Sequence, residues 1–302
     1  MPLETPAPPD AAFLRKHWPL TGATIGSSFG GPFGRRVFVV RADQGTFAAK
    51  VNDSPPPVET ATADLDVLDY LATRGYRHVP ALLRTRSGAS LVHTGTRSVV
   101  ILEFIPGRFD HDGPPQATAW EALARATAAL NAHTDYPHQS GQAFIDQVPD
   151  DLRLKVRGNR VEPEFVALLK RIEPLQHAAQ RSLVHGEVNF ANSGYRRDGT
   201  VVLLDWDGTG TGPTALDYGY PLITQFVDQH DRTLHRDVAE AFYGAYTDAG
   251  GLVDVELAFL AAVFQALFLM WFFNTDERWE RIQWAVEHEA ELCTLIERAC
   301  VR

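Results

Sequence analysis

The change of pattern after the first third of the chain limits its fold more than any other feature. Three runs of apolar and β-branched residues, separated by short polar turns, occupy residues 24–29, 36–42 and 46–51. Such spacing is typical of an antiparallel meander. After Gly107 the apolar positions recur at helical spacing instead. The sequence therefore predicts an α+β protein with a small β-rich part, residues 1–105, followed by a larger helical part, residues 106–302.

Further elements are expected on both sides of this boundary. Leucines at i, i+3 and i+6 predict a helix over Val58–Ala72. The proline and glycine of Ile105-Pro106-Gly107 should end the sheet, because proline lacks a backbone donor and glycine permits a sharp turn. Two more strands are expected, over Val79–Leu83 and Ser98–Phe104. Two later helices are expected over Gln116–His133 and Pro163–Gln180, and the chain should be mostly helical from Asp217 onward.

Charge and hydropathy argue against nucleic acid and membrane as partners. The net charge is −10, and no basic patch with interleaved aromatic residues occurs. The longest apolar run, Ala258–Phe273, is interrupted by Gln265 and is shorter than the about 18 residues that a bilayer span needs. We expect a buried core helix there. The polar start of the chain does not resemble a signal peptide, and two cysteines, Cys293 and Cys300, spaced too far apart to bridge within one helix, suit a reducing cytoplasm.

One block of polar residues has the composition of a phosphoryl-transfer centre. Glu187 is followed five residues later by Asn192, and Asp205 comes thirteen residues after that, at the end of the apolar run Val201–Leu204. Phosphoryl transfer needs a group that accepts the hydroxyl proton and hard oxygen ligands for Mg²⁺. We therefore predict Glu187 as the base and Asn192 and Asp205 as metal ligands, joined by a hairpin over Ser193–Leu204 that turns at Asp198-Gly199. A polar loop on a surface hairpin is the alternative.

The β-rich part offers groups that could bind phosphates. A glycine-rich turn lets backbone amides approach phosphate oxygens, and Gly30 and Gly31, with Ser28 beside them, form such a turn. Lys50 is one of only four lysines among 28 basic residues and ends an apolar strand, which suits a compact ammonium aimed at the α- and β-phosphates. A lysine at the sheet edge, with its head in solvent, is the alternative interpretation.

A lysine that binds phosphates is usually held by a carboxylate of the next helix. Asp64 faces the sheet in the predicted helical register, and Glu59 lies one turn earlier. We expect Asp64 to pair with Lys50. An ordinary solvated carboxylate remains an equal alternative for Asp64.

The order of these features resembles the aminoglycoside phosphotransferase and choline kinase family. The resemblance rests on the glycine-rich hairpin, the strand lysine, Glu103-Phe104-Ile105-Pro106-Gly107, His-Gly-x-x-x-x-x-Asn from His185, and Leu-Asp-Trp. It implies the bilobal protein-kinase-like fold, with ATP and Mg²⁺ as cofactors. It also implies that backbone groups of Glu103 and Ile105 read the adenine edge, that His185 belongs to the catalytic loop, and that Asp217 braces this loop. A plain helix N-cap is the alternative for Asp217.

Two residues depart from the family pattern. The family normally has aspartate at the position of Glu187 and glutamate at that of Asp64. A misplacement of about 1 Å can lower a rate ~100-fold. Either the backbone compensates at both positions, or catalysis is slow or lost.

Three functions follow from these observations. The leading hypothesis is an O-phosphotransferase that moves the γ-phosphate of ATP to a hydroxyl of an antibiotic or other natural product. The acidic C-terminal quarter would suit a cationic acceptor, although a solvated acidic surface is the commoner explanation. A Ser/Thr kinase acting on a biosynthetic precursor peptide is the second hypothesis. The third is a pseudokinase that binds nucleotide and partners another protein.

Overall fold

The computed structural model describes residues 7–30, 35–53, 58–109, 116–138, 162–272 and 276–301. The chain divides into two compact units. The first unit contains Met1–Gly107 and Tyr195–Leu204, and the second contains Arg108–Gly194 and Asp205–Arg302. A segment inside the second half of the sequence therefore folds with the N-terminal part.

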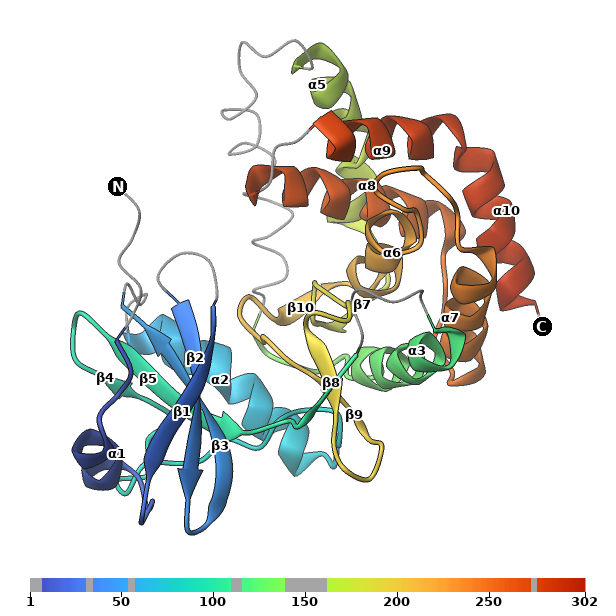
Figure 1. The fold of residues 1–302 in the computed structure, drawn as a ribbon. Coiled ribbons are helices and arrows are strands. Elements are labelled where there is room, and N and C mark those ends of the chain that lie inside the picture. The colour runs from blue at the N-terminus through green and yellow to red at the C-terminus, as the bar shows by residue number, and fades with distance from the viewer. Residues whose placement is uncertain are drawn as a thin grey trace. The chain divides into compact units, whose positions relative to one another are not determined.

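The first unit is built on a five-stranded antiparallel sheet with the order β1-β2-β3-β5-β4 (Figure 1). Its strands and helices are α1 (Ala11–His17), β1 (Thr24–Gly30), β2 (Arg35–Ala42), β3 (Gly45–Asn52), α2 (Val58–Thr73), β4 (Val92–His93) and β5 (Ser98–Glu103). Apolar residues of the central strands, such as Val40, Ala49 and Ile101, form its core with Leu14 and Trp18. The predicted meander, the helix and the strand before Phe104 are confirmed.

The strand predicted over Val79–Leu83 is wrong. Only an isolated bridge between Leu82 and Leu102 forms there, through hydrogen bonds from Leu83 N to Ile101 O (2.9 Å) and from Glu103 N to Ala81 O (2.7 Å). Pro80 lacks an N–H group, so the segment cannot continue a ladder.

The hairpin expected over Ser193–Leu204 is present. Strands β8 (Ser193–Tyr195) and β9 (Val201–Leu203) join β6 (Gly107–Arg108) in a three-stranded sheet with the order β6-β8-β9. The turn is closed by a hydrogen bond from Arg196 N to Thr200 O (2.9 Å), and Gly199 has φ of +83°. That left-handed conformation suits glycine, as the predicted Asp198-Gly199 turn requires.

The second unit is mainly helical (Figure 1). Its elements are α3 (Ala117–Asn131), α5 (Glu162–Arg171), the 3₁₀ helix η1 (Glu173–His177), β7 (Arg181–Val184), β10 (Gly210–Pro213), α6 (Ala215–Thr224), α7 (Arg236–Asp248), α8 (Val255–Phe272), α9 (Asp276–Glu287) and α10 (Glu289–Cys300). Strands β7 and β10 form a small antiparallel sheet. The helix predicted over Pro163–Gln180 is confirmed only as far as Arg171, and the rest of the prediction is wrong. A separate 3₁₀ helix follows from Glu173, with Pro174 in its first turn.

Helix α8 is the core helix predicted from the apolar run. It packs so closely on α6 that a Cβ added to Gly219 would lie 2.6 Å from the Ala258 carbonyl oxygen. Glycine at this position thus permits the two helices to approach. Within the described part of the chain, no helix is both long and apolar enough to cross a membrane.

Candidate active site

A buried carboxylate holds the backbone of the loop that follows β7. Asp217, in the first turn of α6 and fully buried, accepts hydrogen bonds from the backbone N–H groups of His185 (3.0 Å) and Gly186 (2.7 Å). Asn131 Nδ2 donates a third bond to it (2.8 Å), and Tyr246 donates to Asn131 Oδ1 (2.9 Å). Burial raises the pKa of Asp217, while these donors oppose the rise by stabilising the carboxylate. The N-cap position of α6 belongs to Thr214, so Asp217 does not serve as the cap.

Glu187 and Asn192 meet within this loop. Asn192 Nδ2 donates to Glu187 Oε2 (3.0 Å) and to the Glu187 backbone carbonyl (3.3 Å). Burial raises the pKa of the Glu187 carboxyl, and the negative charge of Asp205 adds to the rise. His185 and the bond from Asn192 act in the opposite direction. A carboxylate made more basic by its surroundings is better suited to accept a proton near neutral pH.

The rest of the loop is fixed by local hydrogen bonds and aromatic packing. Asn189 Oδ1 accepts from Asn192 N (2.8 Å), and Asn189 Nδ2 donates to the Tyr220 hydroxyl (3.2 Å). Phe190 stacks between Phe109 (ring centroids 4.6 Å apart) and Trp120 (4.3 Å). The amide of Asn192 is therefore carried on a backbone with little freedom to move.

Asp205 lies in a strained backbone conformation. Strand β9 ends at Leu203, so Asp205 lies two residues beyond the strand and not at its end. Asp205 is exposed. Its φ of +60° is uncommon for a residue other than glycine and costs about 1–2 kcal/mol. Trp206 is buried beside it and contacts the His185 ring edge-on (5.0 Å). Strain of this kind gathers at functional sites, where surrounding structure maintains it.

The predicted phosphate-binding residues of the first unit lie on neighbouring strands. Lys50 is half-buried on β3, opposite Val37 of β2 and Val100 of β5. Ser28 and Gly30 lie on β1, where the pairing with β2 is irregular between Ile25 and Ser28. Gly31 and the side chain of Asp64 lie outside the described residues, so the expected pairing of Asp64 with Lys50 stays a prediction.

Arg196 is a residue that sequence reasoning missed. It directly follows β8, at the start of the turn, and donates from Nε and Nη2 to the two carboxylate oxygens of Glu103, each at 2.7 Å. This pairing lowers the pKa of the Glu103 carboxyl. Because Glu103 N donates to Ala81 O, the backbone group that Glu103 could offer to an adenine edge is its carbonyl. Ile105, the other residue predicted for that edge, is buried just beyond β5.

The donor set near Glu187 suits a cation that also binds phosphates. Among the described residues no group of three or more histidine, cysteine, aspartate and glutamate side chains could hold a metal by itself. Asn192 and Asp205 supply one amide and one carboxylate, and Mg²⁺ is commonly held by one or two carboxylates together with substrate phosphates. The amide nitrogen of Asn192 donates to Glu187, which leaves the amide oxygen as the atom that could bind a metal.

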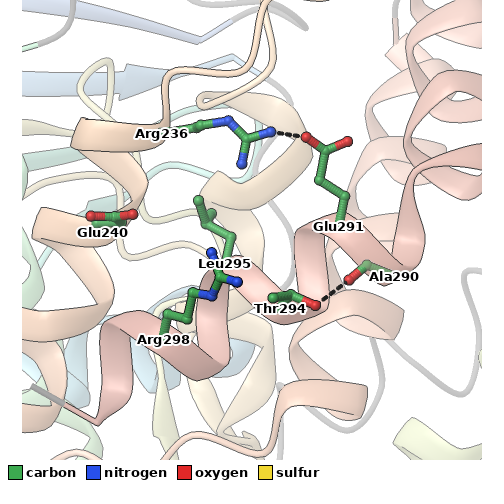
Figure 2. A pocket seen from close by; sticks show the side chains of 7 residues that line it. All are labelled: Arg236, Glu240, Ala290, Glu291, Thr294, Leu295 and Arg298. Atoms are coloured by element: carbon green, nitrogen blue, oxygen red, sulfur yellow. Dashed lines mark hydrogen bonds and ion pairs between the residues drawn. The ribbon is translucent and has the colours of Figure 1, made fainter.

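A separate cavity of about 320 Å³ lies between α7 and α10 (Figure 2). Its lining consists of Arg236, Glu240, Ala290, Glu291, Thr294, Leu295 and Arg298. Arg236 and Glu291 form an ion pair across it. None of the predicted site residues lines this cavity, so we assign it no part in the reaction.

Residues 26–262 match the family described as the phosphotransferase enzyme family. The chain belongs to this family. The match covers both Lys50 and the loop from His185 to Asp207. The prediction of the family is thereby confirmed.

This phosphotransferase-family chain is also similar to a curated protein. An uncharacterised protein from Deinococcus radiodurans is 26% identical over 229 residues, which is 69% of this chain and 64% of the relative. The chain thus spans less than two thirds of the length of this curated relative.

Solved structures of low sequence identity share the fold. A microcompartment-associated aminopropanol kinase aligns with a TM-score of 0.61 and 18% identity, covering 96% of this chain and 97% of the other. A spectinomycin phosphotransferase in complex with ADP and spectinomycin aligns with a TM-score of 0.59 and 11% identity, covering 95% and 92%. The predicted α+β, protein-kinase-like fold class is confirmed.

Proposed function

We propose that this protein transfers the γ-phosphoryl group of ATP to a hydroxyl group of a small molecule. The observation that carries the proposal is the meeting of Glu187 and Asn192 on a loop whose backbone is held by Asp217. Family membership supports the same reaction class. A base and a metal ligand on one rigid loop are what phosphoryl transfer requires, because catalysis rests on positioning and charge stabilisation.

Each residue has a distinct role in this proposal. Glu187 accepts the proton of the attacking hydroxyl, and its raised pKa favours that step. Asn192 and Asp205 hold Mg²⁺, which neutralises phosphate charge when bound. Lys50 binds the α- and β-phosphates, with Ser28, Gly30 and Gly31 offering backbone amides. Backbone groups of Glu103 and Ile105 read the adenine edge, and His185 and Asp217 maintain the loop.

We further propose a cationic, amine-bearing acceptor. Asp207 is exposed and lies near enough to Glu187 to raise its pKa, and unlike Asp205 it is not assigned to Mg²⁺, so it leaves a negative charge near the base. Such charge attracts cations. An aminopropanol kinase and a spectinomycin phosphotransferase share the fold, which supports a small acceptor of this kind.

Turnover by Glu187 variants tests the proposal. The purified chain, Mg²⁺ and ATP are screened against hydroxyl-bearing amines by ATP depletion and by mass spectrometry of the acceptor. We expect Glu187→Gln to lower kcat by ~100-fold or more, because the base is gone. Nucleotide should still raise the melting temperature, and Glu187→Asp should retain turnover. Glu240→Gln, on the wall of the cavity between α7 and α10, is the matched control and should remain active.

Two outcomes would contradict the assignment. Full activity of Glu187→Gln would show that Glu187 is not the base. The second outcome concerns the wild-type protein: its melting temperature rises with ATP, but it phosphorylates no small-molecule acceptor. This result would favour a pseudokinase, or a peptide kinase if serine or threonine peptides are phosphorylated instead.

A further inference from the structure

A single polar residue interrupts the most apolar helix of the protein. Gln265 lies in the middle of α8 and is the one amide, charged or hydroxyl-bearing side chain between Ala258 and Phe272. It is fully buried. Burying an amide costs free energy unless its polar atoms find partners. A leucine or methionine would fill the same space without that cost.

The hydrogen bonding of Gln265 is one-sided. Its Nε2 donates to the backbone carbonyl of Gly186 (2.7 Å), which fixes the orientation of the amide because a carbonyl can only accept. Within the described part of the chain, its buried Oε1 has no hydrogen-bond partner. An unsatisfied buried acceptor costs about 1–3 kcal/mol, which offsets the about 0.5–1.5 kcal/mol that the bond from Nε2 contributes. The stability of α8 therefore gives no reason for an amide at this position.

The carbonyl that Gln265 holds belongs to the peptide immediately before Glu187. The N–H of the same peptide, on Glu187, faces His185 Nδ1 at 3.3 Å. On the other side of Gly186, its own N–H is held by Asp217 (2.7 Å). Gly186 has φ of +85°. Glycine adopts positive and negative φ about equally readily, so its own backbone preference does not hold this conformation. The backbone around Gly186 is therefore held by these contacts rather than by its own preference. They fix the direction in which the Glu187 side chain leaves the backbone.

We propose that Gln265 is a positioning residue that fixes the Gly186–Glu187 peptide and so sets where the Glu187 carboxylate reaches. The inference rests on the proposed role of Glu187 as the base. Gln265 lies outside the part of the chain that matches the family, which ends at residue 262. Glutamate is one methylene longer than the aspartate that the resemblance predicts here, so an error in backbone direction grows toward its carboxylate.

Kinetics of Gln265→Met test this inference, because methionine has nearly the same length and lacks the donor. We expect kcat to fall roughly 10- to 100-fold, as for a displacement of about 1 Å at the reacting group. The KM of the acceptor and the melting shift caused by ATP should stay unchanged. The urea midpoint should remain near that of wild type, because the unsatisfied Oε1 is lost together with the donor. Gln265→Leu is a second variant with the same expected result.

Leu267→Ala is the control for a purely structural effect. Leu267 is fully buried and lies on the side of α8 opposite Gln265, two residues further along. Its truncation should lower the urea midpoint and leave kcat per folded molecule unchanged. Wild-type kcat in Gln265→Met, or a loss of kcat that follows the loss of folded protein in both variants, would overturn the inference. A wild-type protein without any Mg²⁺- and ATP-dependent turnover would instead overturn the proposed function, and the inference with it.

Discussion

The ion pair between Arg196 and Glu103 gives a prediction that can be worked out from the structure. Arg196 donates to both oxygens of Glu103 and also to the backbone carbonyls of Val79 (2.9 Å) and Arg77. One side chain thus ties the β8–β9 hairpin to the end of β5 and to the segment before Pro80. We expect Arg196→Met to loosen all three within the first unit.

The size of the effect follows from burial. The side chains of Arg196 and Glu103 are 24% and 29% exposed, so solvent screens the pair only in part. Bonds to charged groups contribute about 1.5–3 kcal/mol when shielded, and exposed pairs about 0–1 kcal/mol. For a bidentate pair in between, with one buried carbonyl also lost, we expect the free energy of unfolding to fall by ~2–3 kcal/mol.

Arg77 offers a matched control, because its side chain contacts the turn of the same hairpin. It pairs with Asp198 at 3.4 Å, but the two side chains are 74% and 55% exposed. Arg77→Met should therefore change the free energy of unfolding by less than about 0.5 kcal/mol. Urea unfolding of both variants at pH 7, followed by circular dichroism, measures the difference. Equal losses in the two variants would refute the reasoning.

The same pair predicts a pH dependence. The pKa of Glu103 is lowered from its ordinary value of 4.5, chiefly by the bonds from Arg196. The stabilisation is therefore complete above pH 4.5 and is lost as the pH falls through the lowered pKa. The gap between wild type and Arg196→Met should be widest near neutral pH and should narrow in acid. A gap that stays constant or widens below pH 4 would contradict this assignment.

Two glycines give further predictions with different causes. Gly219→Ala should lower the free energy of unfolding by about 1–3 kcal/mol, because the new Cβ would lie 2.6 Å from the Ala258 carbonyl and force α6 and α8 apart; an unchanged urea midpoint would contradict this packing. Gly186→Ala meets no atom within 4 Å, so its cost should be only the about 1–2 kcal/mol of a left-handed backbone, with a fall in kcat that steady-state kinetics would detect; full activity would argue against a fixed Gly186.

The parts of the fold that the sequence predicted are those governed by local pattern. The meander up to Asn52, the helix α3 and the Asp198-Gly199 turn each depend on alternation, helical spacing or turn residues within a few positions. Strand β10, Gly210–Pro213, has two glycines and a proline and no alternation, so nothing local indicates it. Its pairing with β7 depends on residues far away in the sequence.

The same distinction separates the site residues. Glu187, Asn192 and Asp205 could be proposed because their spacing fits one chemistry. Arg196 and Gln265 could not, because their partners lie 93 and 79 positions away in the sequence. The left-handed backbone at Asp205 also escapes sequence reasoning, since aspartate adopts φ of +60° in a minority of its occurrences and no local pattern marks this one.

The central claim is that the loop from His185 to Asp207 binds a metal–nucleotide complex. Titration calorimetry of ATP, in Mg²⁺ and in EDTA, tests it without knowledge of the acceptor. For wild type we predict that Mg²⁺ tightens ATP binding, and that Asp205→Asn loses most of this gain while binding ATP in EDTA as wild type does. An equal gain from Mg²⁺ in both proteins would contradict the account.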